Sequence, residues 1–298
     1  MKIENSDLKT ITWQESDIIG SGSFADVFLS KLQNSVDGFI DVAVKVYKKP
    51  LSVHNVSDIL LEERTLRDLN HKNIVKYYGS IVKQVTRRGR QVLEWGLVME
   101  YCTRTLSDIL LDSDFNNPGK LSFDDPICVA SLQTIAMYAL QICCALTYLH
   151  GKSLVHRDLK LANILVTTAN EVKLSDLGLT KAEVDITASS VGSPIYMAPE
   201  VLKRNVFYDR KADIYSFGIL LWEMWYGFDA GDYMKNILFN TVEHSVAEEG
   251  LRPPLTINHP PPDSLMAEIK RCWNNEADKR PDAADLAPFF QSIINQNR

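Results

Sequence analysis

Short apolar and alternating segments dominate the first hundred residues of the chain. Segments of this kind predict half-buried β-strands. One stretch, 56–69, instead repeats its apolar residues at helical spacing. The predicted strands are 11–19, 26–32, 40–47, 74–82 and 92–99. This part of the chain is therefore expected to form a small β-rich lobe with one helix.

Long helical patterns follow Tyr101, where the character of the chain changes. They cover 106–111, 132–150, 211–225, 232–248 and 264–273. Polar or Pro-rich connections lie at 112–126 and 252–263. The pattern predicts an α+β protein in which a larger, mainly helical lobe follows the small one, with the boundary near residues 100–105.

An uncharged stretch, 129–149, is long enough to cross a membrane. Polar residues interrupt it, and its most apolar positions follow helical spacing. It is therefore expected to be a buried helix and no membrane span. No N-terminal stretch resembles a signal peptide, so a cytoplasmic location is expected.

Composition excludes several classes of protein. The chain has 298 residues, a length typical of about two compact units. Its 32 basic and 38 acidic residues give a net charge of −6, which lacks the basic surface of a nucleic-acid binder. Five cysteines without regular spacing are expected to be reduced thiols.

A glycine-rich segment, Gly20-Ser21-Gly22-Ser23-Phe24-Ala25-Asp26-Val27, lies between the first two predicted strands. Glycines let the backbone approach phosphates closely and offer N–H groups to them. A second strand follows, whereas a helix follows in a Rossmann unit. The segment indicates a strand–turn–strand flap over a nucleotide, with a plain glycine-rich hairpin as the alternative.

A lysine and a glutamate are expected to pair in the β-rich lobe. Strand alternation puts Lys45 on the same face as Ala43. On the predicted helix, Glu62 lies on the inward apolar stripe. A buried carboxylate is costly without a positively charged partner, and Lys45 is the candidate partner. Glu63 points about 100° away and is expected on the solvated face, paired with Arg67.

The strongest signal is His156-Arg157-Asp158-Leu159-Lys160-Leu161-Ala162-Asn163. Asp176-Leu177-Gly178 and then Ala198-Pro199-Glu200 follow it. These motifs occur in the order of the protein kinase catalytic set.

Over about residues 13–292 the chain resembles a eukaryotic protein kinase domain. It is similar in particular to the tyrosine-kinase-like group of serine/threonine kinases, in the segment Asp213-Ile214-Tyr215-Ser216-Phe217-Gly218 and in Cys272-Trp273 followed by Lys279-Arg280-Pro281. The resemblance implies the two-lobed kinase fold, with a small antiparallel-sheet N-lobe at 13–101 and a larger helical C-lobe at 102–292. It also implies that residues 1–298 form a single kinase domain.

The resemblance implies roles in ATP- and Mg²⁺-dependent phosphoryl transfer to protein substrates. Asp158 would orient the substrate hydroxyl, Lys160 would reach the γ-phosphate, and Lys45, held by Glu62, would contact the α- and β-phosphates. Asn163 and Asp176 would bind Mg²⁺. The nucleotide site would comprise Gly20, Ser21, Gly22, Ser23, Phe24, Ala25, Val27, Ala43, Lys45, Met99, Glu100, Cys102 and Leu165.

Specificity and regulation are also implied. Lys160 and Tyr196 favour Ser/Thr transfer over tyrosine transfer, and dual specificity stays open. Phosphorylation at Thr187, Ser189 or Ser190 is expected to activate the enzyme, because a phosphate can pair with an arginine such as Arg157. Glu200 and Arg280 are expected to form a buried pair, and Asp213 to hold the backbone next to Asp158.

Two other functions would use part of the same residue set. A pseudokinase scaffold would bind nucleotide without transferring phosphate, but residues of all the catalytic types are present. A small-molecule kinase of the aminoglycoside type is not expected to carry Ala198-Pro199-Glu200 with an arginine partner.

Overall fold

The computed structural model divides the chain into two compact units, which we call the β-rich unit (residues 1–103) and the helical unit (residues 104–298). The structure describes residues 8, 11–22, 25–34, 38–49, 56–87, 89–111, 130–182, 194–203, 209–237, 241–257 and 259–296.

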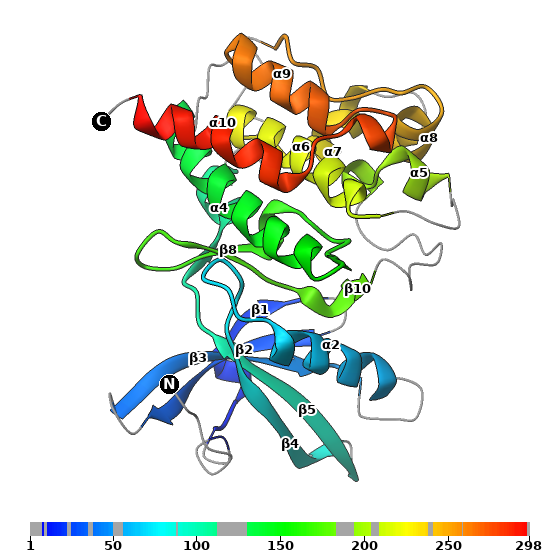
Figure 1. The fold of residues 1–298 in the computed structure, drawn as a ribbon. Coiled ribbons are helices and arrows are strands. Elements are labelled where there is room, and N and C mark those ends of the chain that lie inside the picture. Colours follow the sequence, from blue (N-terminus) through cyan, green and yellow to red (C-terminus); the bar gives the residue numbers. More distant parts are fainter. Residues whose placement is uncertain are drawn as a thin grey trace, which may run out of the picture. The chain divides into compact units, whose positions relative to one another are not determined.

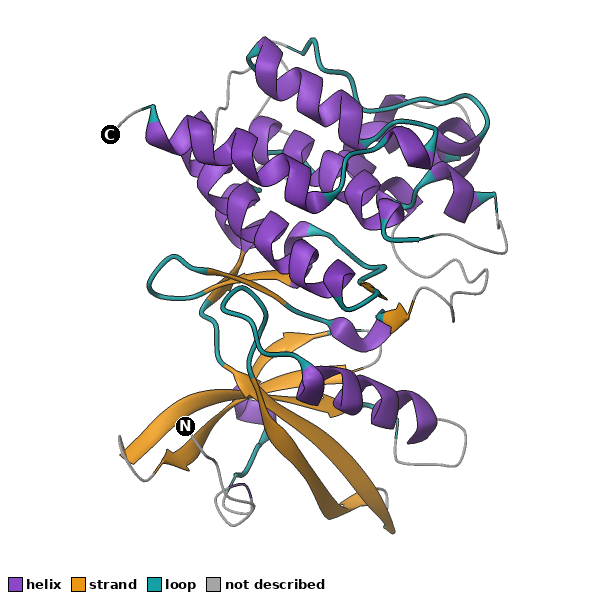
Figure 2. Cartoon of the chain, in the orientation of Figure 1, coloured by secondary structure: helices purple, strands orange, loops and turns teal. Residues whose placement is uncertain are grey.

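An antiparallel sheet of five strands, in the order β1-β2-β3-β5-β4, forms the β-rich unit (Figure 1). The strands are β1 (Ile18–Ser21), β2 (Ala25–Asn34), β3 (Gly38–Tyr47), β4 (Tyr77–Arg87) and β5 (Arg90–Glu100). One helix, α2 (Val56–Asp68), contacts β4, and Figure 2 shows it beside the strands. The predicted small β-rich lobe, with a helix over the predicted stretch, is confirmed.

Strand alternation separates the two faces of this sheet. Val42, Val44 and Val46 point into a hydrophobic core that also contains Leu8 and Ile11 from the N-terminal segment. The opposite face carries the intervening residues of β3, and it is this face that α2 approaches. Lys45 therefore lies on the helix side of the sheet.

The first predicted strand is only partly correct. Residues 11–14 are irregular, and Glu15–Asp17 form a single 3₁₀ turn, η1, before β1 begins at Ile18. The carboxylate of Asp17 accepts a hydrogen bond of 3.2 Å from the backbone N–H of Gln14. This local bond stabilises a turn where the apolar alternation predicts a strand.

The helical unit contains eight α-helices among its described residues. They are α3 (Leu106–Leu110), α4 (Leu132–Gly151), α5 (Pro199–Leu202), α6 (Lys211–Tyr226), α7 (Ala230–Ile237), α8 (Val242–Ala247), α9 (Asp263–Cys272) and α10 (Ala283–Asn295). Short strands form two small sheets, β6-β8-β9 and β10-β7. Their bounds are β6 (Arg104–Thr105), β7 (Leu154–Val155), β8 (Ile164–Val166), β9 (Val172–Leu174) and β10 (Lys181–Ala182). Single 3₁₀ turns are η3 (Leu161–Asn163), η4 (Leu177–Leu179), η6 (Pro194–Tyr196) and η7 (Ala277–Lys279).

Helix α4 corresponds to the uncharged stretch of the sequence. By length and composition it is the one described helix that could cross a membrane, and half of its apolar window is buried in the protein. It packs against α10, as Figure 1 shows. Its buried side chains recur at helical spacing and include Ile135, Ala139, Ile142 and Leu146. These contacts place α4 in the core of the helical unit.

The predicted helix 232–248 is wrong as a single element. The structure has two helices here, α7 ending at Ile237 and α8 beginning at Val242. Thr241 has an extended backbone, and its hydroxyl accepts a hydrogen bond from the N–H of His244. A side chain that caps a helix in this way begins a new helix there. Helix α10 was not predicted; it carries Pro288 in its interior, a residue that disfavours helices.

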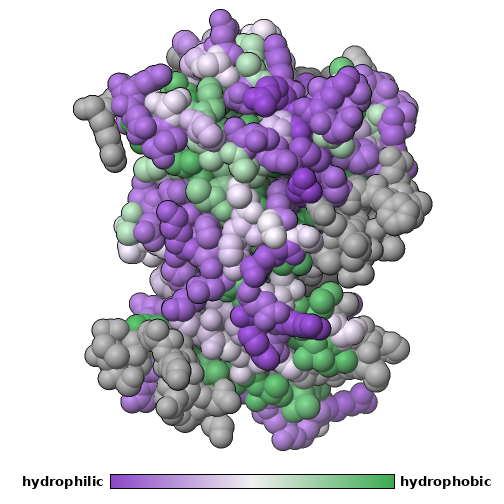
Figure 3. Space-filling view, in the orientation of Figure 1, coloured by the Kyte–Doolittle hydropathy of each residue, from purple (hydrophilic) through white to green (hydrophobic). Residues whose placement is uncertain are grey.

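Large apolar side chains remain exposed on the β-rich unit. Leu60 and Leu61 of α2 and Val82 and Leu93 of β4 and β5 are all between 47% and 49% exposed. Figure 3 shows hydrophobic surface over α2 and the β4–β5 hairpin. The helix therefore covers only part of its face of the sheet.

Candidate active site

The described residues of the glycine-rich segment form a tight turn between β1 and β2. Gly20 pairs with Val27 and Ser21 with Asp26, and the N–H of Gly22 donates to the carbonyl of Ala25 at 2.9 Å. This is the strand–turn–strand arrangement predicted from the sequence. Ser23 and Phe24, the other two candidates of this sequence segment, lie outside the described residues.

Four other nucleotide-site candidates share one face of the sheet. Val27 lies directly opposite Lys45, and Ala43 lies directly opposite Met99. Opposed residues in a sheet project to the same face, and alternation adds Ala43 to the face of Lys45. Neighbouring strands therefore bring small and apolar side chains together around the lysine.

The end of β5 and the residues just after it carry two further candidates, Glu100 and Cys102. The N–H of Glu100 donates to the carbonyl of Lys76 at 2.8 Å, and its carboxylate accepts from the N–H of Lys76 at 3.2 Å. Cys102 is partly exposed and is not part of a disulfide among the described residues. Leu165, the remaining candidate, lies on β8 of the helical unit, between Thr105 and Lys173 on the neighbouring strands.

The lysine and the glutamate of the β-rich unit are paired. The ammonium of Lys45 donates to Oε1 of Glu62 at 2.8 Å, and the side chains are 15% and 6% exposed. The hydroxyl of Tyr47 donates to the other oxygen, Oε2. The expected Lys45–Glu62 pair is therefore present, and Tyr47 is a third member that the sequence reasoning missed.

The expectation for Glu63 is wrong in one respect. Arg67 does pair with it, one helical turn away, but Glu63 is buried instead of solvated. Strand β4 covers this side of α2, and the hydroxyls of Tyr77 and Ser80 donate to Oε1 of Glu63 at 3.0 and 3.1 Å. Burial, together with the nearby charge of Glu63, raises the pKa of Tyr77 to about 12.

The segment 156–163 of the helical unit is fixed by buried polar contacts. His156 is fully buried, and its Nε2 lies 2.9 Å from the carbonyl oxygen of Ser175. Because a carbonyl only accepts, Nε2 carries the proton and Nδ1 accepts from the N–H of Asp158 at 3.3 Å. The imidazole therefore sets the backbone of Asp158 from one side.

Asp213 of α6 holds the same segment from the other side. Its two carboxylate oxygens accept from the N–H groups of His156 and Arg157, each at 2.9 Å. His150 lies 2.9 Å from Oδ2 as well. Burial alone would raise the pKa of Asp213, but the hydrogen bonds that its carboxylate accepts from His150 and from the N–H of Arg157 outweigh burial and lower that pKa. Asp213 therefore stays ionised and anchors the backbone, as expected.

Asp158 receives two hydrogen bonds on one carboxylate oxygen. The ammonium of Lys160 and the amide nitrogen of Asn163 both lie 2.9 Å from Oδ2. Asn163 also donates to the carbonyl of Asp158 at 2.7 Å. The structure therefore brings together three residues that the sequence analysis had singled out in this segment.

Asp176 and Asn163 are suited to a hard divalent cation. The backbone N–H and the hydroxyl of Ser175 both donate to the carbonyl of Asn163 at 2.9 Å, which ties the two segments together. Asp176 follows in a left-handed conformation with φ of 56° and an exposed side chain. Because the amide nitrogen of Asn163 bonds Asp158, its amide oxygen points elsewhere. Carboxylate and amide oxygens are the ligands that Mg²⁺ takes alongside phosphates and water.

Among the described residues, no group of three or more His, Cys, Asp or Glu side chains could hold a metal ion by itself.

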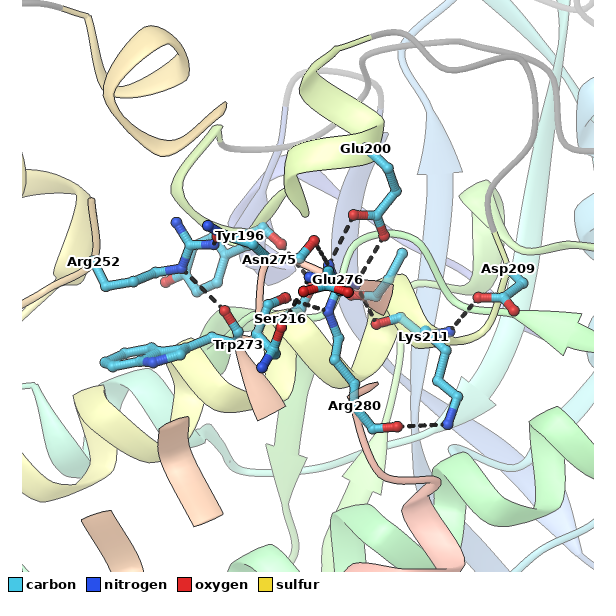
Figure 4. Close-up of polar contacts among 12 residues, drawn as sticks. Tyr196, Glu200, Asp209, Lys211, Ser216, Arg252, Trp273, Asn275, Glu276 and Arg280 are labelled. Atoms are coloured by element: carbon cyan, nitrogen blue, oxygen red, sulfur yellow. Dashed lines mark hydrogen bonds and ion pairs between the residues drawn. The ribbon is translucent and has the colours of Figure 1, made fainter. Parts of the chain in front are cut away.

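A buried network surrounds Arg280 (Figure 4). Its guanidinium donates to both carboxylate oxygens of Glu200, at 2.7 and 2.8 Å, and its side chain is fully buried. It also donates to the carbonyls of Asn274 and Lys211. The expected Glu200–Arg280 pair is therefore present, and it joins α5 to the segment before α10.

A further buried carboxyl, which the sequence patterns did not indicate, is Glu223 of α6. Its Oε1 accepts from the hydroxyl of Tyr196 at 2.6 Å and from the N–H of Ala230 at 2.9 Å. The hydroxyl of Ser216 donates to the carbonyl of Tyr196 at 2.7 Å. Burial raises the pKa of Glu223 to about 8. The signal in the sequence is an acidic residue between Trp222 and Met224, in the apolar second half of the helix.

The predicted phosphorylation sites Thr187, Ser189 and Ser190 lie outside the described residues.

A small antiparallel sheet with one helix, a mainly helical unit, and catalytic motifs in this order define the protein kinase class. The model of the protein tyrosine and serine/threonine kinase family matches residues 13–290, and the chain belongs to that family. The expected family and the two-lobed α+β fold are thereby confirmed.

Similar proteins include serine/threonine and dual-specificity kinases. A serine/threonine-protein kinase of Arabidopsis thaliana is 29% identical over 93% of this chain and 44% of its own length. A dual specificity protein kinase of Dictyostelium discoideum is 31% identical over 94% of this chain and 34% of its own length. A dual serine/threonine and tyrosine protein kinase of Gallus gallus is 30% identical over 93% of this chain and 27% of its own length. The chain thus spans less than half the length of these relatives.

Proposed function

We propose that this chain is an ATP- and Mg²⁺-dependent protein kinase that transfers the γ-phosphate to Ser and Thr hydroxyls of protein substrates. The observation that carries the proposal is the Asp158 cluster, in which Lys160 and Asn163 both donate to Oδ2. A buried carboxylate held by two donors keeps one orientation, as a group that positions a substrate hydroxyl must.

In the proposed reaction the hydroxyl oxygen of the substrate bonds to the γ-phosphorus. The bond from that phosphorus to the β–γ bridging oxygen breaks, and ADP leaves with the bonding electrons. Asp158 orients the hydroxyl and accepts its proton, while Lys160 places a positive charge beside the transferred phosphoryl group. Bound Mg²⁺, for which Asn163 and Asp176 are the candidate ligands, would supply charge neutralisation at the phosphate oxygens.

Within the β-rich unit, Lys45 is the candidate contact for the α- and β-phosphates. Its pairing with Glu62 supports this role, because a lysine with a fixed carboxylate partner presents its charge in one place. We propose that the two units act together as one catalytic domain.

The specificity for Ser and Thr rests on Lys160 and on Tyr196 before Ala198. Dual specificity is the second candidate, because two of the relatives are named as dual-specificity kinases. Phosphoamino-acid analysis of the product distinguishes the two. Phosphotyrosine alone would refute the Ser/Thr assignment.

The deciding experiment is a transfer assay with ATP, Mg²⁺ and a generic protein substrate. We expect phosphate incorporation by the unaltered chain and its loss in Asp158→Asn and Lys45→Met. If the unaltered chain binds nucleotide but transfers no phosphate, the result would indicate the pseudokinase alternative. Incorporation that survives both substitutions would contradict the mechanism.

Activation by phosphorylation at Thr187, Ser189 or Ser190 is a separate part of the proposal. A phosphate adds roughly two negative charges and can order a segment by pairing with arginine. Phosphatase treatment is expected to lower the rate, and a single phosphate-blocking substitution such as Thr187→Ala, Ser189→Ala or Ser190→Ala should reproduce the loss. An unchanged rate after complete dephosphorylation would contradict it.

A further inference from the structure

Tyr47 completes the hydrogen bonding of the carboxylate that pairs with Lys45. Its hydroxyl donates to Oε2 of Glu62, while Lys45 donates to Oε1 at 2.8 Å. Both donors come from β3, two residues apart on the same face of the sheet. Strand β3 therefore donates hydrogen bonds to both carboxylate oxygens of Glu62 on α2.

The burial of Glu62 makes the second donor matter. Glu62 is 6% exposed, so water has little access to its carboxylate. A carboxylate removed from water is costly unless its oxygens receive hydrogen bonds. With the Tyr47 hydroxyl removed, the carboxylate would lower its energy by rotating toward solvent, and Lys45 would lose its fixed partner.

Tyr47 also acts on Lys45 directly. The ammonium of Lys45 lies 5.8 Å from the centre of the Tyr47 ring, within the range of a cation–π contact. This contact depends on the ring, whereas the bond to Glu62 depends on the hydroxyl. The substitution Tyr47→Phe keeps the first and removes the second.

We propose that Tyr47 is a positioning residue of the phosphoryl-transfer site. Through its hydroxyl it holds Glu62 in the orientation that fixes Lys45 toward the nucleotide. This inference rests on the proposed function, because it assigns Lys45 to the phosphates of ATP.

The hydrogen bond from Tyr77 to Glu63, the residue next to Glu62 on α2, provides a matched control. Tyr77 donates to Oε1 of Glu63 at 3.0 Å, also from a strand to the same helix. Glu63 pairs with Arg67 on that helix, and Lys45 pairs with Glu62. Tyr77→Phe thus removes a hydroxyl–carboxylate bond between the sheet and α2 without touching the Lys45 pair.

The first test compares steady-state kinetics of Tyr47→Phe, Tyr77→Phe and the unaltered chain with ATP and a protein substrate. Tyr47→Phe should lower kcat/KM for ATP about tenfold, equivalent to about 1.4 kcal/mol, while KM for the protein substrate changes less than about twofold. Tyr77→Phe should stay within about twofold in both. An equal loss in both variants would mean that the hydroxyls only anchor α2, and would overturn the proposal.

The second test asks whether Tyr47 acts through Glu62. In a Glu62→Ala background, Tyr47→Phe should change neither the dissociation constant of ATP, measured by calorimetry, nor kcat/KM by more than about twofold. A tenfold loss that persists without the carboxylate would overturn the proposal.

The third test does not depend on catalysis. The coupling between Lys45 and Glu62, obtained from urea unfolding of Lys45→Met, Glu62→Gln and the double variant, should fall when the cycle is repeated with Tyr47→Phe. Unchanged coupling would overturn the proposal even if the chain is an active kinase. If the unaltered chain transfers no phosphate and binds no ATP, the proposed function fails, and this cycle still decides whether Tyr47 holds the pair.

Discussion

The buried carboxyl of Glu223 should make the stability of the protein fall as the pH rises. Glu223 is completely buried in α6. Burial raises its pKa to about 8, and the hydrogen bonds from Tyr196 and from the N–H of Ala230 only partly counteract this. The folded protein therefore keeps a proton on Glu223 at neutral pH.

The sign and size of the effect follow from the two pKa values. In the unfolded chain the group titrates near its ordinary value of 4.5, and in the folded chain near 8. Between these values the folded state holds a proton that the unfolded state releases, so raising the pH favours unfolding. Proton linkage with these values removes about 2.5 kcal/mol of stability between roughly pH 6 and pH 8.5.

The substitution Glu223→Gln isolates this contribution. The glutamine amide is neutral at every pH, and its oxygen can still accept from Tyr196 and Ala230. Both proteins are unfolded in urea at about pH 6, 7 and 8.5. The free energy of unfolding of the variant, relative to that of the unaltered chain, should rise by about 2.5 kcal/mol from the lowest to the highest pH. All other titrating groups cancel in the difference, and Glu171→Gln, an exposed carboxyl of the helical unit, controls for loss of charge. Parallel pH profiles for the unaltered chain and Glu223→Gln would refute the reasoning.

Three further substitutions test the packing of the helical unit. Arg280→Met should lower the stability by about 3–5 kcal/mol in thermal unfolding, because it leaves the carboxylate of Glu200 without the partner that donates to both its oxygens. Arg280→Lys should be more stable than Arg280→Met but less stable than the unaltered chain. A loss below about 1 kcal/mol for Arg280→Met would contradict the buried-pair argument. Gly218→Ala should cost about 1–3 kcal/mol in urea unfolding, since its Cβ would lie 2.9 Å from the Cβ of Cys272; Gly151→Ala, whose Cβ meets nothing within 4 Å, is the control, and equal costs would disprove the steric argument. Ser131→Ala should lower stability by about 1 kcal/mol, because the N–H of Thr134 loses its 3.1 Å acceptor at the start of α4; Ser131→Asp should restore it, and no change in the midpoint of thermal unfolding would contradict the capping role.

The periodic patterns of the chain predicted the elements whose faces differ most in polarity. The pattern predicted strands β2, β3 and β5 because one face of each strand is apolar. It predicted helices α4 and α6 because most of their side chains are apolar. Where a local side-chain bond decides the backbone, periodicity failed. The bond from Gln14 to Asp17 makes a turn out of part of a predicted strand, and Thr241 begins a new helix inside a predicted one.

In the candidate site, the sequence motifs identified the residues but only some of their partners. Motif spacing singled out Asp158, Lys160 and Asn163, and the structure adds that both neighbours donate to the same oxygen of Asp158. The pairing of Lys45 with Glu62 was predictable because an inward carboxylate on a helix needs a cation. No such rule points to Tyr47, since a tyrosine on a half-buried strand face has many possible acceptors.

Glu62 and Glu63 show where reasoning from periodicity ends. A helical step of about 100° correctly separates the two carboxylates and predicts different partners for them. It cannot say what lies beyond each side of the helix. Strand β4 supplies the hydroxyls of Tyr77 and Ser80 to Glu63, so a residue assigned to solvent becomes one of the buried contacts between α2 and the sheet. Helix α2 is thereby joined to the sheet at two carboxylates, one to β3 at Lys45 and Tyr47 and one to β4. A substitution at Glu63 should therefore weaken the attachment of α2 to β4. A substitution at Glu62 should instead remove the carboxylate that fixes the position of Lys45.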